Sequence, residues 1–273
     1  MIESTPLADY GAITDTQQAT WASGDFHEIA RQNVVMAEAL CQAVDPHAGE
    51  QVLDVACGSG TAALVAARRY CAVTGIDYVP ALVERARMRA QADLLEVDLR
   101  VADAQDLPFA DGSFDAVLSV YGVQFAPDQQ RAADELLRVC RPGGRIGLAS
   151  PVPDGWSGDF FAAHARYAPP PPGVPSPQRW GTTGGLADLL GDQARSITNE
   201  HRTALQYYRS IEHAVEVFST YFGPTIRALE AVGPEREADL RRDLAEVFTR
   251  YNRTADGTAV VENTYLLSVA VRA

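Results

Sequence analysis

The sequence predicts an α/β fold built on a doubly wound, mostly parallel sheet of about seven strands. Short apolar runs alternate with segments of helical spacing between residues 51 and 150, and this alternation is typical of a parallel sheet covered by helices on both faces. The length of 273 residues and a composition of 47% hydrophobic and 22% charged residues suit one large globular domain. No internal repeat or shift of composition divides the chain, so we expect a single domain over residues 1–273.

The N-terminal region has the pattern of an amphipathic helix over residues 15–44. Apolar side chains recur there at steps of three and four residues. These are Ile29, Val34, Ala37, Leu40 and Val44. Pro46 and Gly49 end the pattern. We therefore expect residues 1–45 to form a helical cover.

Residues 50–150 carry the strand and helix alternation. Five buried strands are predicted, at residues 51–56, 72–77, 99–103, 114–119 and 144–150. Helices are predicted between them, at residues 61–69, 81–92 and 128–140. Ligands of such sheets bind at the carboxyl ends of the strands, near the point where the strand order reverses.

The C-terminal half is less regular. Six of the sixteen prolines fall within residues 169–177, so residues 151–185 are predicted to form a stiff connection without a core element, as an insertion over the ligand edge. Further elements are expected as a strand at 204–208, helices at 211–222 and 235–252, and a last strand at 264–271. The chain is thus expected to return to the sheet within residues 223–273.

The charge balance restricts the binding partners. All 23 basic residues are Arg, against 36 acidic residues, which gives a net charge of −13. The lack of Lys excludes Schiff-base and phosphate-loop lysine chemistry. Binding to nucleic acid or to an anionic membrane is not expected, because both draw affinity from clustered positive charge.

The four cysteines lie far apart, with no CxxC pair and no metal-finger spacing, so we expect reduced thiols and no metal site. The N-terminus lacks a charged stretch followed by an apolar one, and no apolar run approaches 18 residues. We therefore expect neither a signal peptide nor a membrane span, and a cytoplasmic location.

The sharpest local signal is the stretch VLDVACGSGT at residues 52–61, a strand that enters a glycine turn and opens a helix. Glycine allows the backbone to turn tightly and to approach a ligand closely. Gly58, Gly60 and Ala63 also fit the dinucleotide fingerprint, and Asp77 follows at about the spacing of a ribose-binding acid. An NAD-dependent oxidoreductase is therefore one open alternative.

Acidic residues at the strand ends favour a different ligand. Asp54 precedes the turn inside a buried strand, and Asp77 and Asp103 end the next two strands. A buried carboxylate is costly unless it meets a cation or hydrogen-bond donors. Such clustering would repel a pyrophosphate, whereas a cationic ligand with a ribose diol and an exocyclic amine would suit it. No hydride-transfer constellation supports the dehydrogenase.

At these motifs the sequence resembles the class I S-adenosylmethionine-dependent methyltransferases, particularly the small-molecule UbiE/type 11 group. The resemblance covers residues 50–150, through LDVACGSGT, GIDYVPALVERAR, VADAQDLPFADGSFDAVLS and ELLRVCRPGGRIGLAS. It implies a Rossmann-like fold, S-adenosylmethionine as cofactor, and methyl transfer to a small, apolar or aromatic acceptor.

Carried over position by position, the resemblance implies a cofactor-binding set. Its members are Asp54, Ala56, Gly58, Ser59, Gly60, Asp77, Tyr78, Asp103, Ala104 and Ser119. Asp54 and the turn would form the floor under the methionine moiety, and Ser119 would contribute backbone near the amino group. Asp77 would take the ribose hydroxyls and Tyr78 would flank the adenine. Asp103 with Ala104 would read the adenine edge. Ala56 departs from the family, where many members have Gly.

The acceptor site is expected to be shaped by residues 10–35 and 151–222. Candidate acceptor-binding residues are Trp21, Phe26, Tyr121, Gln124, Trp156 and Trp180, although the tryptophans and Tyr121 equally suit packing roles. His27 and His164 are the candidates for a general base, if the acceptor needs one, and otherwise are structural. A noncatalytic S-adenosylmethionine-binding regulatory or partner subunit is the second alternative.

Overall fold

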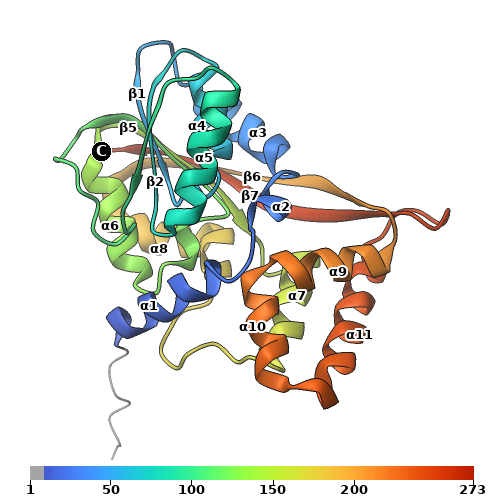
Figure 1. Cartoon of the computed structure of the whole chain (residues 1–273). Coiled ribbons are helices and arrows are strands. Elements are labelled where there is room, and N and C mark those ends of the chain that lie inside the picture. Colours follow the sequence, from blue (N-terminus) through green and yellow to red (C-terminus); the bar gives the residue numbers. More distant parts are fainter. Residues whose placement is uncertain (1–8) are drawn as a thin grey trace, which may run out of the picture.

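The computed structural model describes residues 9–273, and a seven-stranded sheet forms its centre (Figure 1). The strands are β1 (Gln51–Val55), β2 (Ala72–Asp77), β3 (Val97–Val101), β4 (Phe114–Val120), β5 (Cys140–Pro151), β6 (Ala194–Tyr208) and β7 (Ala259–Arg272). Their order across the sheet is β3-β2-β1-β4-β5-β7-β6. Strands β1 to β5 pair in parallel, and β7 runs antiparallel to both β5 and β6. The predicted doubly wound, mostly parallel sheet is confirmed.

Helices cover both faces of the parallel strands. One face packs against α3 (Val34–Val44), α4 (Thr61–Ala67) and α5 (Pro80–Ala92), and the other against α6 (Gln129–Val139) and α8 (Thr183–Leu190). Because both faces are buried, the central strands read as nearly continuous apolar runs. The residues that start these helices suit their positions. Pro80 opens α5, where a missing N–H costs nothing, and the Asp128 carboxylate caps α6 by accepting from the Arg131 N–H.

The N-terminal cover consists of three helices instead of the single predicted one. They are α1 (Tyr10–Trp21), α2 (His27–Ala30) and α3. The break after α1 packs against α9 (Ile211–Tyr221), because a Cβ at Gly24 would lie 2.2 Å from the Tyr221 carbonyl oxygen. The apolar spacing of the sequence continues across this break, so it could not reveal it. The first eight residues of the predicted cover lie outside the described part of the chain.

A second group of helices, here called the helical cap, packs beside the sheet under the long β6–β7 pair (Figure 1). It contains α7 (Trp156–Ala165), α9, α10 (Gly223–Val232) and α11 (Pro234–Arg250). Its core is rich in phenylalanine, including Phe160, Phe218 and Phe248. The cap is inserted in two pieces, α7 after β5 and the remaining helices between β6 and β7.

Two predictions for the C-terminal half were wrong. Residues 151–185 contain helix α7, because the proline cluster is confined to the loop that follows it and to the short helix η2 (Pro177–Gly181). Strand β6 begins at Ala194, ten residues before the predicted strand. Its first half lies at the edge of the sheet and is largely exposed and polar, so it lacks the apolar pattern of a buried strand.

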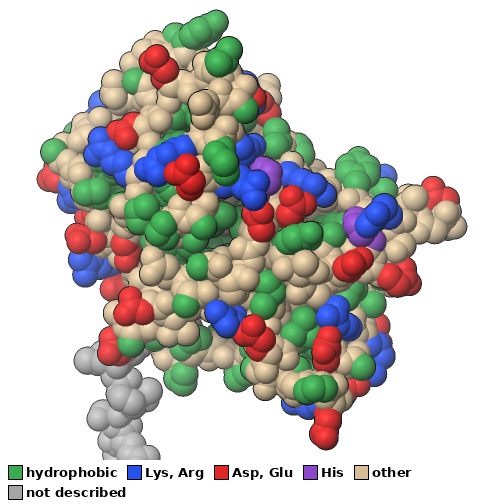
Figure 2. Space-filling model, in the orientation of Figure 1, with side chains coloured by type: hydrophobic (Ala, Val, Ile, Leu, Met, Phe, Trp, Pro, Cys, Tyr) green, Lys and Arg blue, Asp and Glu red, His purple; other side chains and the backbone are tan. Residues whose placement is uncertain are grey.

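Within residues 9–273, no helix is long and apolar enough to cross a membrane. Acidic and basic side chains are interspersed on the face shown in Figure 2, without a broad basic field. The four cysteines are free and buried.

Candidate active site

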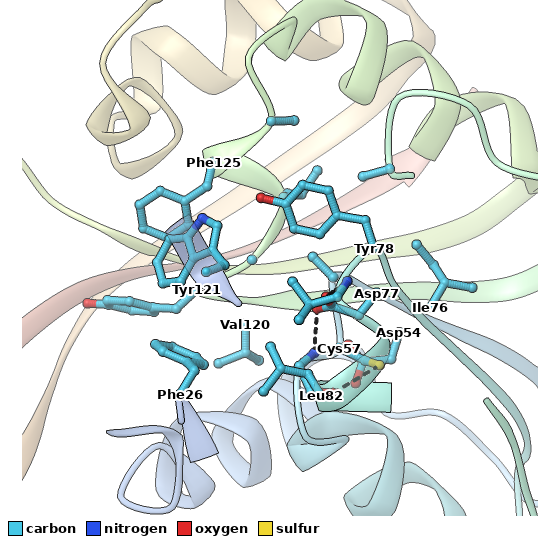
Figure 3. Close-up of a pocket in the computed structure, with 18 of the residues that line it drawn as sticks. Phe26, Asp54, Cys57, Ile76, Asp77, Tyr78, Leu82, Val120, Tyr121 and Phe125 are labelled. Carbon is cyan, nitrogen blue, oxygen red and sulfur yellow. Dashed lines mark hydrogen bonds between the residues drawn. The ribbon is translucent and has the colours of Figure 1, made fainter. Parts of the chain in front are cut away.

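A cavity lies at the carboxyl ends of β1, β2 and β4, where the strand order reverses (Figure 3). Strand β1 has β2 on one side and β4 on the other, and this switch point is where open α/β sheets bind ligands. The cavity measures about 890 Å³ when the open solvent at its mouth is included. We call it the cofactor cavity.

The glycine turn between β1 and α4 forms one wall of this cavity. Ala56, Gly58 and Gly60 all have left-handed backbone angles, with φ of 54°, 54° and 80°. A Cβ at Gly60 would lie 3.0 Å from the Ala86 Cβ on α5, so this position favours glycine for space as well as for conformation. Ala56 carries a methyl group that Gly122 accommodates, because a Cβ at Gly122 would come within 2.8 Å of it.

Asp54 is a buried carboxylate with a single protein donor. It is 1% exposed and accepts one hydrogen bond, from the Ala63 N–H of α4 at 2.7 Å. Burial raises the pKa of Asp54 to about 7, and the nearby Asp77 charge acts in the same direction. It forms no ion pair with any residue of 9–273. The carboxylate therefore has unused capacity for a positively charged ligand.

Asp77 connects the end of β2 to the glycine turn. Its two oxygens accept from the Gly58 N–H at 2.9 Å and from the Val79 N–H at 2.8 Å. Burial raises the pKa of Asp77 to about 6, against the opposing effect of these two hydrogen bonds. A carboxylate offers about four lone-pair sites, so two remain for a ligand. Figure 3 shows Asp77 and Asp54 side by side on one wall, with Tyr78 above them.

Asp103 is held by a residue that the sequence analysis missed. Gln105 donates to Asp103 from its backbone N–H at 2.9 Å and from its side-chain amide at 3.1 Å. The same amide reaches Thr14 of α1 at 3.1 Å, and Gln18 of α1 donates to the Tyr78 carbonyl oxygen. Helix α1 is thereby attached across the cofactor cavity at two points.

A second cavity of about 450 Å³, open space included, adjoins the first. Its walls come from α1, η1 (Val123–Phe125), α7, α9, β6 and β7, and from the segment between α1 and α3. The residues that line both cavities are Trp21, Phe26, Asn33, Tyr121 and Phe125. The second cavity is further lined by Ile29, Trp156, Ser157, Phe160, Phe161, Gln206, Phe218, Phe222 and Asn263. Aromatic rings therefore form most of this wall.

Most of the predicted cofactor-binding residues come together. Those lining the cofactor cavity are Asp54, Ala56, Gly58, Asp77, Tyr78, Asp103 and Ala104. Ser59, Gly60 and Ser119 do not line it. The Ser59 hydroxyl faces His27 and Arg89, at 3.0 and 3.1 Å. The Ser119 hydroxyl donates to the Val55 carbonyl oxygen at 2.8 Å and accepts from the Val123 N–H at 2.9 Å, so it connects β1 to η1.

The predicted acceptor residues divide into two groups. Trp21, Phe26 and Tyr121 line both cavities, and Trp156 lines the second. Gln124 and Trp180 need correction. Successive residues of the 3-10 helix η1 face different directions, so Phe125 lines the cavities while Gln124 is buried away from them. Trp180 is 0% exposed and packs in the core between the sheet and α8, where the proline-rich loop returns the chain.

Neither of the two histidines predicted as possible bases lines either cavity. His164 is buried in the helical cap, with its ring nitrogens at 2.9 Å from the Phe160 carbonyl oxygen and 2.7 Å from the Thr225 hydroxyl. Burial lowers the pKa of His164 to about 4. His27 faces Ser59, and burial together with Arg89 and Arg85 lowers its pKa. His164 is thus held inside the helical cap, and His27 lies beside the glycine turn.

Several lining residues lacked a usable sequence signal. They are Asn33, Phe125, Ser157, Gln206 and Asn263. Asn33 interrupts the apolar N-terminal stripe, which was a weak sign of a special role. Ser157, Gln206 and Asn263 lie 32 to 142 positions from Tyr121 and Phe125, so only the fold brings them together.

The fold and the cofactor cavity define a class: a Rossmann-like α/β protein with an acidic ligand site at the carboxyl edge of its sheet. A family model described as a methyltransferase domain matches residues 53–148. An uncharacterised protein of Mycobacterium tuberculosis is 36% identical over 275 residues, which cover 99% of each chain. A demethylmenaquinone methyltransferase of Clavibacter sepedonicus is 41% identical over 119 residues, which cover 42% of this chain and 48% of that enzyme.

Among solved structures, the fold is similar to that of the YcgJ protein from Bacillus subtilis. The TM-score is 0.60 at 20% identity, over 87% of this chain and 98% of that one. The chain belongs to the class I methyltransferases, as its motifs predicted, and the solved structure has the same fold.

Proposed function

We propose that this methyltransferase uses S-adenosylmethionine to methylate a small, apolar or aromatic acceptor. One observation supports the proposal above all. Two buried carboxylates without a cationic partner in residues 9–273 lie in a cavity that shares a wall with a second, aromatic cavity. A cationic cofactor in the first cavity would place its reactive end near an apolar molecule in the second.

The residues present suit this cofactor. Asp54 would face the positively charged methionine end, where its charge is otherwise uncompensated. Asp77 retains two acceptor sites for a ribose diol after its two backbone hydrogen bonds. Apolar side chains that suit an adenine face line the same cavity, including Ile76, Val79 and Leu82.

The bound cofactor would supply an electrophilic methyl group on a sulfonium with a neutral leaving group. The chain then has to hold the nucleophile in line and to exclude water. Such positioning can lower a barrier by several kcal/mol. Tyr121 and Phe125 line both cavities and so stand where the two ligands would meet. Burial raises the pKa of Tyr121 above its usual value, so its hydroxyl stays protonated and donates to Asn263.

Catalysis by positioning agrees with the absence of both histidines from the lining of the two cavities. Of the described residues that line the second cavity, Tyr121 alone has a titratable side chain, and it is held protonated. We therefore propose that the acceptor atom is nucleophilic without a side-chain base in this cavity.

The test is transfer of labelled methyl from S-adenosylmethionine to a panel of small aromatic acceptors, with cofactor binding measured by calorimetry on the same samples. We expect binding and transfer to at least one acceptor, and Asp77→Ala is expected to lose both. Binding without transfer to any acceptor would favour the noncatalytic partner subunit. Displacement of S-adenosylmethionine by NAD would favour the oxidoreductase.

We also propose that the chain's partner is a small-molecule acceptor, with no nucleic acid or membrane surface involved, and that it works in the cytoplasm. The negative net charge and the free cysteines support this proposal.

A further inference from the structure

The second cavity is aromatic but carries a distinct polar corner. Asn33, Tyr121, Ser157, Gln206 and Asn263 supply its polar groups. Among the residues that the structure describes, no Asp, Glu, Arg or His lines it. A charged ligand would lose its hydration there without gaining a counter-ion, which is costly. The wall therefore selects for a neutral molecule.

Asn263, on β7, is the centre of the polar corner. Its side-chain oxygen accepts from the Tyr121 hydroxyl at 3.2 Å and from the Ser157 hydroxyl at 3.1 Å. With both hydroxyls donating to the amide oxygen, the amide nitrogen of Asn263 is left without a protein partner among residues 9–273. The side chain on β7 is thereby held by groups from α7 and the end of β4, two separate parts of the chain.

One donor of this corner has no protein acceptor among the described residues. The amide nitrogen of Asn263 donates to no residue of 9–273, although Asn263 is only 1% exposed. The Asn263 amide is therefore free to donate to an acceptor atom of a ligand in this cavity.

Backbone conformation supports a special role for Tyr121. It is a non-glycine residue in the left-handed region, with φ of 50°. Strain of this kind is costly and persists where the surroundings enforce it, often at ligand sites. The position directly follows β4 at the ligand edge, and the hydroxyl is directed to Asn263. Figure 3 shows the Tyr121 ring directed away from Asp54 and Asp77.

We propose that the second cavity binds a neutral aromatic acceptor through one of its oxygen atoms, with Asn263 as the specificity-determining donor. Tyr121 and Ser157 act as positioning residues that hold the Asn263 amide with its N–H groups free. Aromatic rings such as Phe161 and Phe218 contact the flat faces of the acceptor. The proposal rests on the proposed function, because it assigns the acceptor class of the same site.

The test uses three probes of similar shape: 2-naphthol, 2-methylnaphthalene and 2-naphthoate. Binding to the full chain is measured by equilibrium dialysis, with saturating S-adenosylhomocysteine and without it. We expect 2-naphthol to bind about fivefold more tightly than 2-methylnaphthalene, because one neutral hydrogen bond is added. The charged 2-naphthoate is expected to bind most weakly.

Variants then locate the donor. Asn263→Leu is expected to remove the preference for 2-naphthol while 2-methylnaphthalene still binds within about threefold, since apolar contacts remain. Tyr121→Phe is expected to reduce the preference in part, and this milder change serves if Asn263→Leu does not fold. Phe161→Leu is the matched control, because it should weaken both neutral probes equally and keep their ratio.

Four results would each overturn the proposal. The two neutral probes could bind equally, or 2-naphthoate could bind most tightly. No probe could bind, or the preference for 2-naphthol could persist in Asn263→Leu. Binding of S-adenosylhomocysteine in the same samples separates the two proposals. If the cofactor product binds and the probe pattern fails, the acceptor assignment alone falls. If the product does not bind, the proposed function falls.

Discussion

The cofactor cavity and the second cavity share a wall but differ in charge and in origin. The first contains Asp54, Asp77 and Asp103 and is built largely from strand ends within residues 54–127. The second has no charged side chain among the described residues and draws much of its wall from the helical cap and from β6 and β7. The family model matches residues 53–148, so most of the cofactor cavity lies within the segment shared with the family. Much of the second cavity lies outside that segment. Recognition of the cofactor and choice of the acceptor are thus separated along the chain.

The largest effect is expected for Asp77→Ala. The change removes two acceptor sites for the ligand and also frees the Gly58 N–H. Charge-assisted hydrogen bonds are worth roughly 1.5–3 kcal/mol each, so the affinity for S-adenosylhomocysteine should fall at least about 100-fold in calorimetry. Asp98→Ala, on exposed β3 and paired only with Arg100, is the matched control. A loss of less than about threefold in Asp77→Ala would place the ligand elsewhere.

The next largest effect is expected from removing the buried charge of Asp54 in the cofactor cavity. Asp54→Asn should stabilise the ligand-free protein at pH 8 while it weakens cofactor binding. The pKa of Asp54 is raised from 3.8 to about 7, so the unfolded chain releases this proton first and the wild type loses stability as pH rises from about 4 to 7. The gain in the free energy of unfolding should be on the order of a few kcal/mol at pH 8 and should shrink towards pH 4. Urea unfolding at both pH values measures it. An equal effect at pH 4 and pH 8 would contradict the assignment.

A smaller effect is expected for His164→Ala, which acts in the helical cap and not in either cavity. Loss of the ring leaves a cavity and an unpartnered Thr225 hydroxyl, at a cost of about 2–3 kcal/mol in the free energy of unfolding at pH 8. Affinity for S-adenosylhomocysteine should stay within about twofold. The exposed His201→Ala on β6 is the control. If His164→Ala kept full stability and lost methyl transfer, His164 would have to reach the ligands.

The smallest effects are expected for conservative changes at two tryptophans, one in the core and one at the cavities. Trp180→Phe should cost about 1 kcal/mol of stability and leave ligand binding unchanged, because Trp180 packs under the sheet. Trp21→Phe should instead weaken ligand binding, because Trp21 lines both cavities. Thermal melting and calorimetry on both variants make the comparison. Equal effects on binding would mean that the two residues share a site.

The cofactor cavity could be predicted because its sequence signals are local. Each acid lies at the end of its own strand, and the glycine turn directly follows the first strand, so each signal spans only a few residues. The topology then brings those strand ends together. The second cavity and the helical cap depend on contacts between residues that are far apart in the sequence. His164 meets Thr225 across 61 positions, and Tyr121 meets Asn263 across 142, so the sequence showed neither that the histidine is enclosed nor that the asparagine is exposed to a cavity. The polar outer half of β6 was missed because edge strands need no apolar pattern.

The central claim is that buried carboxylates of raised pKa hold a cationic sulfur nucleoside. Calorimetry with S-adenosylmethionine at pH 6.5, repeated in buffers of different ionisation heat, counts the protons released on binding. With pKa values of about 7 for Asp54 and about 6 for Asp77, ionisation on binding should release about one proton in total. Binding without proton release, or no binding heat at all from correctly folded protein, would contradict the claim.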